Sequence, residues 1–194
     1  VNRKKRWIHY GSSISHSKHN ATPSTIWPCI VARENDLHLT SLGFAGNCML
    51  EPMVGRMIGD AEVDMITLKI GINVHGHGAL SVRTFRSSVI GLIQLIRDKH
   101  PMTPIGIISP IYCETREDGR TWERTHTLKE MRQVIMEVVD MFKADGDRHI
   151  YYTSGLEIIG QRDAAYLEDG LHPNTEAQEL MARRFSEKVI GKLQ

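Results

Sequence analysis

The stretch Tyr10–His16 (Y-G-S-S-I-S-H) follows a short apolar run and contains three serines. A serine hydroxyl performs acyl transfer when a base takes its proton, a third group orients that base, and hydrogen-bond donors meet the developing oxyanion. Asp169 and His172 are three residues apart on a tight, glycine-containing segment (D-G-L-H-P-N). One turn there would place the carboxylate against the imidazole and fix its tautomer. The chain therefore offers a candidate nucleophile, base and orienting group.

Two further loops offer candidate donors for an oxyanion. Gly46 lies in L-G-F-A-G-N and can present a backbone N–H with no side chain in the way, and Asn73 lies in G-I-N-V-H-G-H-G and can present a side-chain amide. The serine stretch is not the G-x-S-x-G nucleophile elbow, because Ser15 occupies the position of the second glycine.

These loops follow segments that read as alternating strands and helices. Periodicity predicts five short strands and a set of amphipathic helices, with a capping box at Thr127 and Glu130 before one of them. The predicted strands are Arg6–Tyr10, Leu37–Leu42, Met65–Ile70, Pro104–Ser109 and His149–Tyr152, and the helices are Ser24–Arg33, Glu51–Gly59, Leu80–Lys99, one behind Thr127 and one from about Thr175.

Strands that alternate with helices predict a parallel sheet and a three-layer α/β/α sandwich. In open α/β sheets, ligands bind at the carboxyl ends of the strands, where the candidate residues fall. The longest irregular segment, Tyr112–His126, also follows a strand.

The four blocks, in this order, resemble the SGNH hydrolases, also called GDSL esterases and lipases. The likeness runs from Trp7 to the C-terminus, with Gly11-Ser12-Ser13-Ile14 in place of the family's G-D-S-[LI]. The resemblance implies a flavodoxin-like five-stranded sheet of order 2-1-3-4-5. It also implies Ser13 as the nucleophile in a triad with His172 and Asp169.

The resemblance further implies the oxyanion donors: the Ser13 N–H, the Gly46 N–H and the Asn73 side chain. Two positions depart from the family pattern, because Ser12 and Val74 stand where the family has aspartates. Neither belongs to the proposed triad, but both change the hydrogen bonds near it. G-S-S-I also resembles a subgroup that includes acyltransferases and multidomain enzymes.

The expected function is a serine esterase acting on small or carbohydrate-linked acyl esters through an acyl-enzyme on Ser13, with no metal and no cofactor. An acyltransferase that uses the same acyl-enzyme with a non-water acceptor is the first alternative. A catalytically silent binding module on the same fold is the second, and an interfacial lipase is less favoured because no long apolar lid is visible.

Composition sets the broader expectations. The chain has 194 residues, 41% of them hydrophobic, which suits one catalytic domain over residues 1–194. A net charge of +1 favours neither nucleic acid nor a membrane surface, so the expected partner is a small-molecule ester, and homo-oligomer formation stays open. No run approaches the roughly 18 apolar residues that span a bilayer. The basic start leads into only a few apolar residues, so we expect no signal peptide. We expect a cytoplasmic protein with three reduced cysteines, although the start at Val1 leaves open a longer parent chain.

Other polar residues have simpler interpretations. His75 and His77 could form a metal pair, but no third ligand is evident, and solvent exposure is the favoured interpretation. His16 and His19 are expected on a surface loop, and Glu114, Glu117 and Asp118 on a solvated one. Trp122 is either a platform for a sugar or acyl group or a side chain that pins its loop.

Overall fold

The fold is a five-stranded parallel sheet between two layers of helices. The computed structural model describes residues 3–17, 20 and 22–194. All strand pairs are parallel and the order is β2-β1-β3-β4-β5, which confirms the predicted fold class and sheet order. The strands are β1 Lys5–Gly11, β2 Leu37–Gly43, β3 Met65–Lys69, β4 Ile105–Ile108 and β5 Ile150–Thr153.

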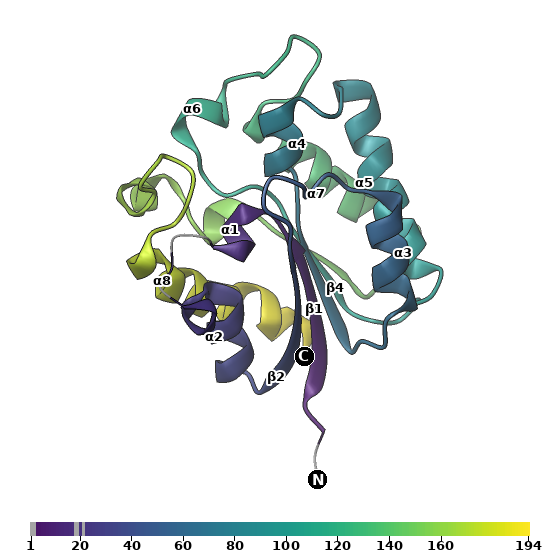
Figure 1. The fold of residues 1–194 in the computed structure, drawn as a ribbon. Helices are drawn as coiled ribbons and strands as arrows, with labels where there is room; N and C mark the ends of the chain where they lie inside the picture. The colour runs from purple at the N-terminus through teal and green to yellow at the C-terminus, as the bar shows by residue number, and fades with distance from the viewer. Residues whose placement is uncertain (1–2, 18–19, 21) are drawn as a thin grey trace.

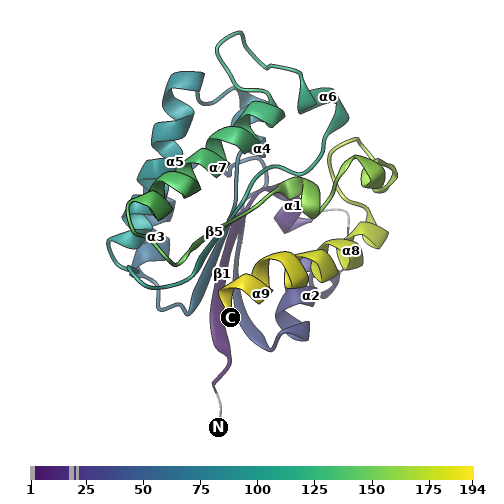
Figure 2. The same cartoon turned by 180° about the vertical axis from the view of Figure 1, so that it is seen from behind.

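Helices cover both faces of the sheet. Figures 1 and 2 show α2 and α8 on one side and α3, α5 and α7 on the other. The helices are α1 Ser13–His16, α2 Trp27–Glu34, α3 Pro52–Asp60, α4 Ile72–His77, α5 Val82–Arg97, α6 Glu114–Glu117, α7 Leu128–Ala144, α8 Thr175–Phe185 and α9 Gly191–Leu193. Short 3₁₀ segments span Pro23–Thr25, Gly155–Glu157 and Gln161–Tyr166, and a π-helical segment spans Ser186–Ile190.

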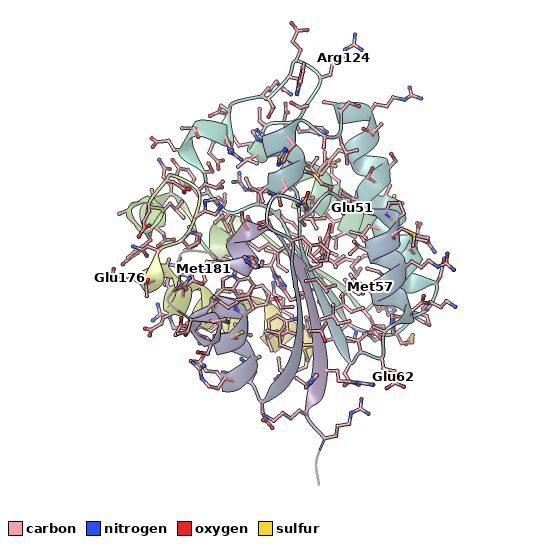
Figure 3. The ribbon with its side chains drawn as sticks, in the orientation of Figure 1. Glu51, Met57, Glu62, Arg124, Glu176 and Met181 are labelled. Atoms are coloured by element: carbon pink, nitrogen blue, oxygen red, sulfur yellow. The ribbon has the colours of Figure 1, made fainter. Side chains whose placement is uncertain are left out.

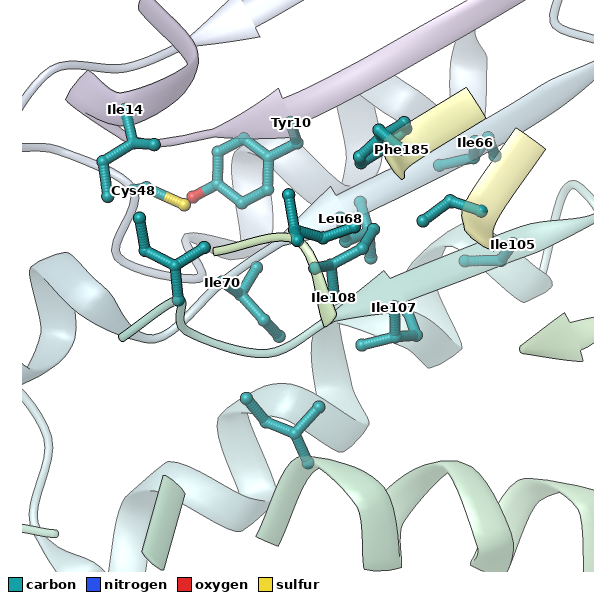
Figure 4. Packing of buried hydrophobic residues seen from close by; sticks show 14 of the residues in the cluster. Tyr10, Ile14, Cys48, Ile66, Leu68, Ile70, Ile105, Ile107, Ile108 and Phe185 are labelled. Carbon is teal, nitrogen blue, oxygen red and sulfur yellow. The ribbon is translucent and has the colours of Figure 1, made fainter. Parts of the chain in front are cut away.

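The core follows from the position of each strand. Every residue of β3 is buried because this central strand is covered on both faces. Leu68 and Ile107 are paired between neighbouring strands, and both belong with Ile108 to the buried core cluster (Figure 4). The edge strand β2, in contrast, leaves several side chains exposed.

The long helices form where the apolar spacing predicts them. In α5, Phe85, Val89 and Ile93 are buried on one face, and α7 begins with the predicted capping box. There the Thr127 N–H donates to Glu130 Oε2 over 2.9 Å, and the Glu130 N–H donates to Thr127 Oγ1 over 3.2 Å. Two otherwise unsatisfied N–H groups are thereby paired at the helix start.

Some boundaries differ from the sequence-based prediction. The helix expected at Ser24–Arg33 begins only at Trp27, because Pro23–Thr25 forms a separate 3₁₀ turn and Pro28 sits in the first turn of α2. The irregular segment Tyr112–His126 contains α6, a helix of one turn. The last helix continues beyond Phe185 through the π-helical segment into α9.

The carboxyl ends of the strands meet at one end of the molecule. Figures 1 and 2 both show α1, α4 and α6 at this end, where they follow β1, β3 and β4. Within the described residues, no helix combines the length and apolar character that crossing a membrane requires.

Candidate active site

Ser13, His172 and Asp169 form a hydrogen-bonded row. Ser13 is the first residue of α1, and its Oγ lies 2.8 Å from Nε2 of His172. Nδ1 of His172 lies 2.6 Å from Oδ2 of Asp169. Ser13 and His172 are 159 positions apart in the chain, so the fold brings the nucleophile to its base. A hydroxyl, a base and a carboxylate in this order are the arrangement that acyl transfer by serine requires.

Asp169 organises the loop that carries the histidine. Its Oδ1 accepts hydrogen bonds from the backbone N–H groups of Leu171 (3.0 Å) and His172 (2.7 Å), while Oδ2 contacts the imidazole. Gly170 makes the turn with a φ of 75°, a conformation that residues with a side chain rarely adopt. The D-G-L-H spacing therefore gives one carboxylate two separate tasks.

The same contacts keep Asp169 ionised. Partial burial raises the pKa of this carboxyl, but the hydrogen bonds from the His172 side chain and from two backbone N–H groups outweigh that effect. Its pKa is held well below its usual range, and the side chain is still 51% exposed. Ionised Asp169 can therefore orient the imidazole and stabilise its protonated form.

Ser12 fixes the entry of the chain into α1. It is fully buried, and its hydroxyl accepts the N–H of Ile14 over 3.2 Å as the N-cap of the helix. The aspartate of the family pattern is thus replaced here by another residue type that caps helices. At the second departure, Val74 is fully buried in the core on α4. Neither departure places an unpaired charge near Ser13.

A buried chain of hydrogen bonds holds α1 to the sheet. Trp7 Nε1 lies 2.8 Å from Thr67 Oγ1, which lies 2.8 Å from His9 Nδ1, and His9 Nε2 lies 2.8 Å from Ser15 Oγ. The indole N–H can only donate, so we assign the Thr67 hydroxyl as donor to His9 Nδ1 and the His9 Nε2–H as donor to Ser15. Ser15 is two residues from the candidate nucleophile.

His9 is a neutral structural residue rather than a second base. It is fully buried, and its pKa is lowered to about 3. Burial is the main cause, and the nearby Lys69 charge is the smaller one. The signal for this residue in the sequence is weak, because R-W-I-H-Y reads as an ordinary strand. Its role becomes visible only when the parallel register sets His9 beside Thr67.

The two candidate oxyanion loops are tied to each other and to β1. The Cys48 N–H donates to Oδ1 of Asn73 over 3.1 Å, and the Phe44 N–H donates to the Gly11 carbonyl over 2.8 Å. Oδ1 of Asn73 is therefore an acceptor, and Nδ2 is left as the donor. Gly46, with a φ of 75°, lies between these two ties.

The three candidate donors have no partner within the described residues. No hydrogen bond there takes up the N–H of Ser13, the N–H of Gly46 or the amide NH2 of Asn73. The structure thus brings the loops after β1, β2 and β3 together, as the sequence predicted. Free donors around a nucleophile are what a developing oxyanion requires.

Several polar residues near this end differ from expectation. His75 is buried rather than exposed, with Nε2 3.0 Å from the Gly119 carbonyl, whereas His77 is exposed. His16 is exposed but ends helix α1 rather than lying on a loop, and His19 lies outside the described residues.

Within the described part of the chain, no three His, Cys, Asp or Glu side chains cluster as metal ligands would. Cys29, Cys48 and Cys113 are free thiols.

The expectation of a solvated acidic loop is wrong for Glu117. Its carboxylate is buried and accepts two hydrogen bonds from Arg132, at 2.6 and 2.7 Å. Arg132 comes from α7, so this pairing could not be read from the local sequence. Glu114 and Asp118 are exposed, as expected.

Trp122 is 65% exposed and lies over Gly78, where an added Cβ would be 2.1 Å from the indole ring.

Fold and site together define an α/β protein with a serine, a histidine and an aspartate in hydrogen-bonded order at the carboxyl ends of its strands. Residues 4–191 match the model of the GDSL-like lipase/acylhydrolase family, and the chain belongs to that family.

Solved structures with the same fold include an acyltransferase and esterases. The salicylyl-acyltransferase SsfX3 from a tetracycline biosynthetic pathway is 29% identical with a TM-score of 0.89, over 100% of this chain and 57% of that one. A putative GDSL-like lipase from Bacteroides ovatus is 23% identical with a TM-score of 0.83, over 98% of this chain and 54% of that one.

A family 3 carbohydrate esterase from Clostridium thermocellum is 16% identical with a TM-score of 0.72, over 98% of each chain. The chain thus spans a little over half the length of the acyltransferase and of the Bacteroides protein. Comparison with the curated proteins gave no match.

Proposed function

We propose that the protein is a serine esterase that hydrolyses small or carbohydrate-linked acyl esters through an acyl-enzyme on Ser13. The 2.8 Å contact between Ser13 Oγ and His172 Nε2 carries the proposal, because it joins a nucleophile to its base. Membership of the GDSL-like lipase/acylhydrolase family supports the same chemistry.

In the proposed mechanism, His172 Nε2 takes the Ser13 proton as Oγ attacks the ester carbonyl carbon. The carbonyl π electrons move to oxygen, and the Ser13 N–H, Gly46 N–H and Asn73 amide donate to that oxyanion. Asp169 stabilises the imidazolium formed at His172. Collapse of the tetrahedral intermediate expels the alcohol, which receives the proton from His172 and leaves the acyl group on Ser13.

Deacylation repeats the sequence with water. His172 takes a proton from water as its oxygen attacks the acyl-enzyme carbonyl, and the second intermediate collapses to release the acid and return the proton to Ser13. Each step uses only side chains and backbone N–H groups of this chain. The proposal needs no metal or organic cofactor.

A first experiment measures hydrolysis of p-nitrophenyl acetate and butyrate. We expect Ser13→Ala to lower kcat by at least about 10³-fold, because it removes the nucleophile. Ser12→Ala is the matched control: it removes a helix cap worth about 1 kcal/mol and leaves the nucleophile in place, so turnover should persist. Equal turnover by wild type and Ser13→Ala would refute the proposal.

Acyl transfer is the second candidate, favoured by the 29% identity to the salicylyl-acyltransferase over the whole of this chain. It shares the acyl-enzyme and differs only in the acceptor. Incubation of the acylated protein with a panel of alcohols, with product analysis, separates the two. Dominant ester formation at millimolar alcohol would favour transfer, and release of free acid regardless of alcohol would favour hydrolysis.

The natural substrate and the cytoplasmic location are predictions from sequence alone. A panel of acetylated sugars against simple alkyl acetates tests the carbohydrate part of the proposal. A silent binding module is a third reading, in which neither turnover nor labelling by an active-site fluorophosphonate would occur.

A further inference from the structure

Arg116 is an unpaired, half-buried cation beside the candidate site. In the segment of residues 112–127, Glu117 pairs with Arg132, Asp118 with Lys129 and Arg120 with Glu130. The unpaired residues Glu114, Glu123 and Arg124 are exposed, and Figure 3 shows Arg124 projecting from the tip of the molecule. Arg116 differs from all of these residues. Among the Asp, Glu, Lys and Arg side chains of this segment, it is the one that is partly buried and has no carboxylate partner.

The guanidinium group of Arg116 lies against helix α4. A Cβ added at Gly76 would be 3.0 Å from Nη1 of Arg116, so the absence of a side chain at Gly76 lets the guanidinium approach the helix backbone. The pKa of His75 is lowered overall. Burial lowers it most, the hydrogen bond to the Gly119 carbonyl raises it, and the nearby Arg116 charge lowers it further. Arg116 therefore bridges from α6 to α4.

This contact falls on the face of α4 that carries Asn73. Residues three and four apart share one face of a helix, so Asn73, Gly76 and His77 are neighbours on α4. Their separation along the axis is about 5 Å, at about 1.5 Å per residue. The same face meets the Gly46 loop, because a Cβ added at Gly46 would be 4.0 Å from His77 Nε2. Arg116 thus contacts α4 at Gly76, about one helical turn from the candidate oxyanion donor Asn73.

Sheltering a guanidinium without a counter-ion costs free energy, which an anionic ligand would recover. The planar guanidinium matches a carboxylate in two parallel hydrogen bonds. We propose that Arg116 is a substrate-binding residue for a carboxylate, so that the ester substrate of this site is an anion. The inference rests on the proposed esterase function and names the class of its substrate.

The carboxylate could belong to the acyl half or to the alcohol half of the ester, and two substrate pairs distinguish these. p-Nitrophenyl glutarate, with a free carboxylate on the acyl half, is compared with neutral p-nitrophenyl pentanoate. 4-Acetoxybenzoate, with the carboxylate on the alcohol half, is compared with neutral 4-acetoxybenzamide. The quantity measured is kcat/KM for each member of each pair.

The variants are Arg116→Met, Arg116→Lys and the control Arg124→Met. We expect wild type to prefer the carboxylate member of one pair, and Arg116→Met to lose about 10- to 100-fold on that member, mainly in KM, with the neutral member within about twofold. Arg116→Lys should retain part of the preference. Arg124→Met should behave as wild type, because its side chain is exposed at the far tip.

Two results would overturn the proposal. One is hydrolysis of neutral and anionic members with no preference in either pair. The other is an equal loss on both members in Arg116→Met, which would make Arg116 a structural bridge between α6 and α4. Failure of the underlying esterase function looks different, because then wild type hydrolyses neither neutral ester and does not react with a fluorophosphonate.

Discussion

The backbone N–H of Cys48 donates a hydrogen bond to Oδ1 of Asn73 over 3.1 Å. This contact assigns the two ends of the Asn73 amide, since its oxygen accepts the Cys48 N–H and its NH2 group is left as a donor. It also ties the loop after β2 to the helix after β3. One hydrogen bond therefore links two of the three candidate oxyanion donors.

Asn73→Asp tests that role at nearly constant shape. The carboxylate still accepts the Cys48 N–H but offers a negative charge where the amide donated, so we expect kcat to fall by about 10²- to 10³-fold or more with little change in folding. Steady-state kinetics and thermal unfolding are measured together. Asn47→Asp, in the loop after β2 and with its amide bonded to the Ala45 carbonyl, is the control. Unchanged kcat in Asn73→Asp would remove Asn73 from the oxyanion site.

Asp169→Asn tests the orientation of His172. The variant keeps an acceptor for the backbone N–H groups but loses the charge that stabilises the imidazolium, and we expect kcat to fall by about 10²- to 10⁴-fold. Glu168→Gln, the adjacent carboxylate, should leave kcat within about twofold. If both variants behaved alike, the 2.6 Å contact with His172 would have no catalytic importance.

The hydrogen-bonded chain beneath α1 predicts that His9 positions the nucleophile. Ser15→Ala leaves the His9 Nε2–H buried without an acceptor, at a cost of about 1 to 3 kcal/mol in the free energy of unfolding. Because Ser15 shares α1 with Ser13, we expect kcat and the rate of fluorophosphonate labelling to fall while KM stays constant.

A purely structural role for this chain would give a different pattern. Stability would then fall without any change in kcat for the fraction that is folded. Asn35→Ala is a suitable control, because it breaks a comparable tie, from Asn35 to Ser186 at 2.9 Å, far along the chain from α1. It should lower stability and leave the labelling rate as in wild type.

Lys69 predicts an unusual dependence of stability on pH. Its side chain is 1% exposed, its Nζ has no hydrogen-bond partner within the described residues, and burial lowers its pKa from 10.5 to about 8. Between about pH 8 and 10.5 the unfolded chain binds more protons at this residue than the folded one. The contribution of Lys69 to the free energy of unfolding therefore rises with pH across that window. Below the window Lys69 is charged in both states, and the folded protein is destabilised by the full cost of burying that charge.

Urea unfolding at pH 7 and pH 9.5 measures this effect. Lys69→Met should raise the free energy of unfolding at pH 7 by on the order of 1 to 3 kcal/mol and abolish the rise toward pH 9.5. Lys188→Met, at an exposed position, should retain the rise. A destabilised Lys69→Met with the wild-type pH dependence would mean that the amine has a stabilising partner.

The sequence predicted the sheet and the pairing of Asp169 with His172 for a physical reason, whereas Ser13 as their partner came from the resemblance to a known family. Strands such as M-I-T-L-K and the apolar face of α5 carry their periodicity locally, and the D-G-L-H spacing allows only a short turn between Asp169 and His172. The parallel fold then requires the loops after β1, β2 and β3 to meet. The periodicity and the turn spacing need no knowledge of long-range packing, whereas the Ser13–His172 contact joins residues 159 positions apart.

What the sequence missed depends on partners distant along the chain. Glu117 reads as solvated until Arg132 is placed beside it, and His9 reads as an ordinary strand residue until the register sets it against Thr67. The short helices α4 and α6 span only one or two turns, too few for a periodic signal. Burial of charged and polar residues is fixed by tertiary contacts, which local patterns do not contain.

The most direct test of the account is the mass of the protein after reaction with a fluorophosphonate, followed by peptide mapping of the adduct. The account predicts one adduct per chain, on Ser13, absent in Ser13→Ala and strongly slowed in His172→Ala, because His172 activates the hydroxyl. An adduct on Ser12 or Ser15, or none on the folded wild-type protein, would contradict the assignment of Ser13 as the nucleophile.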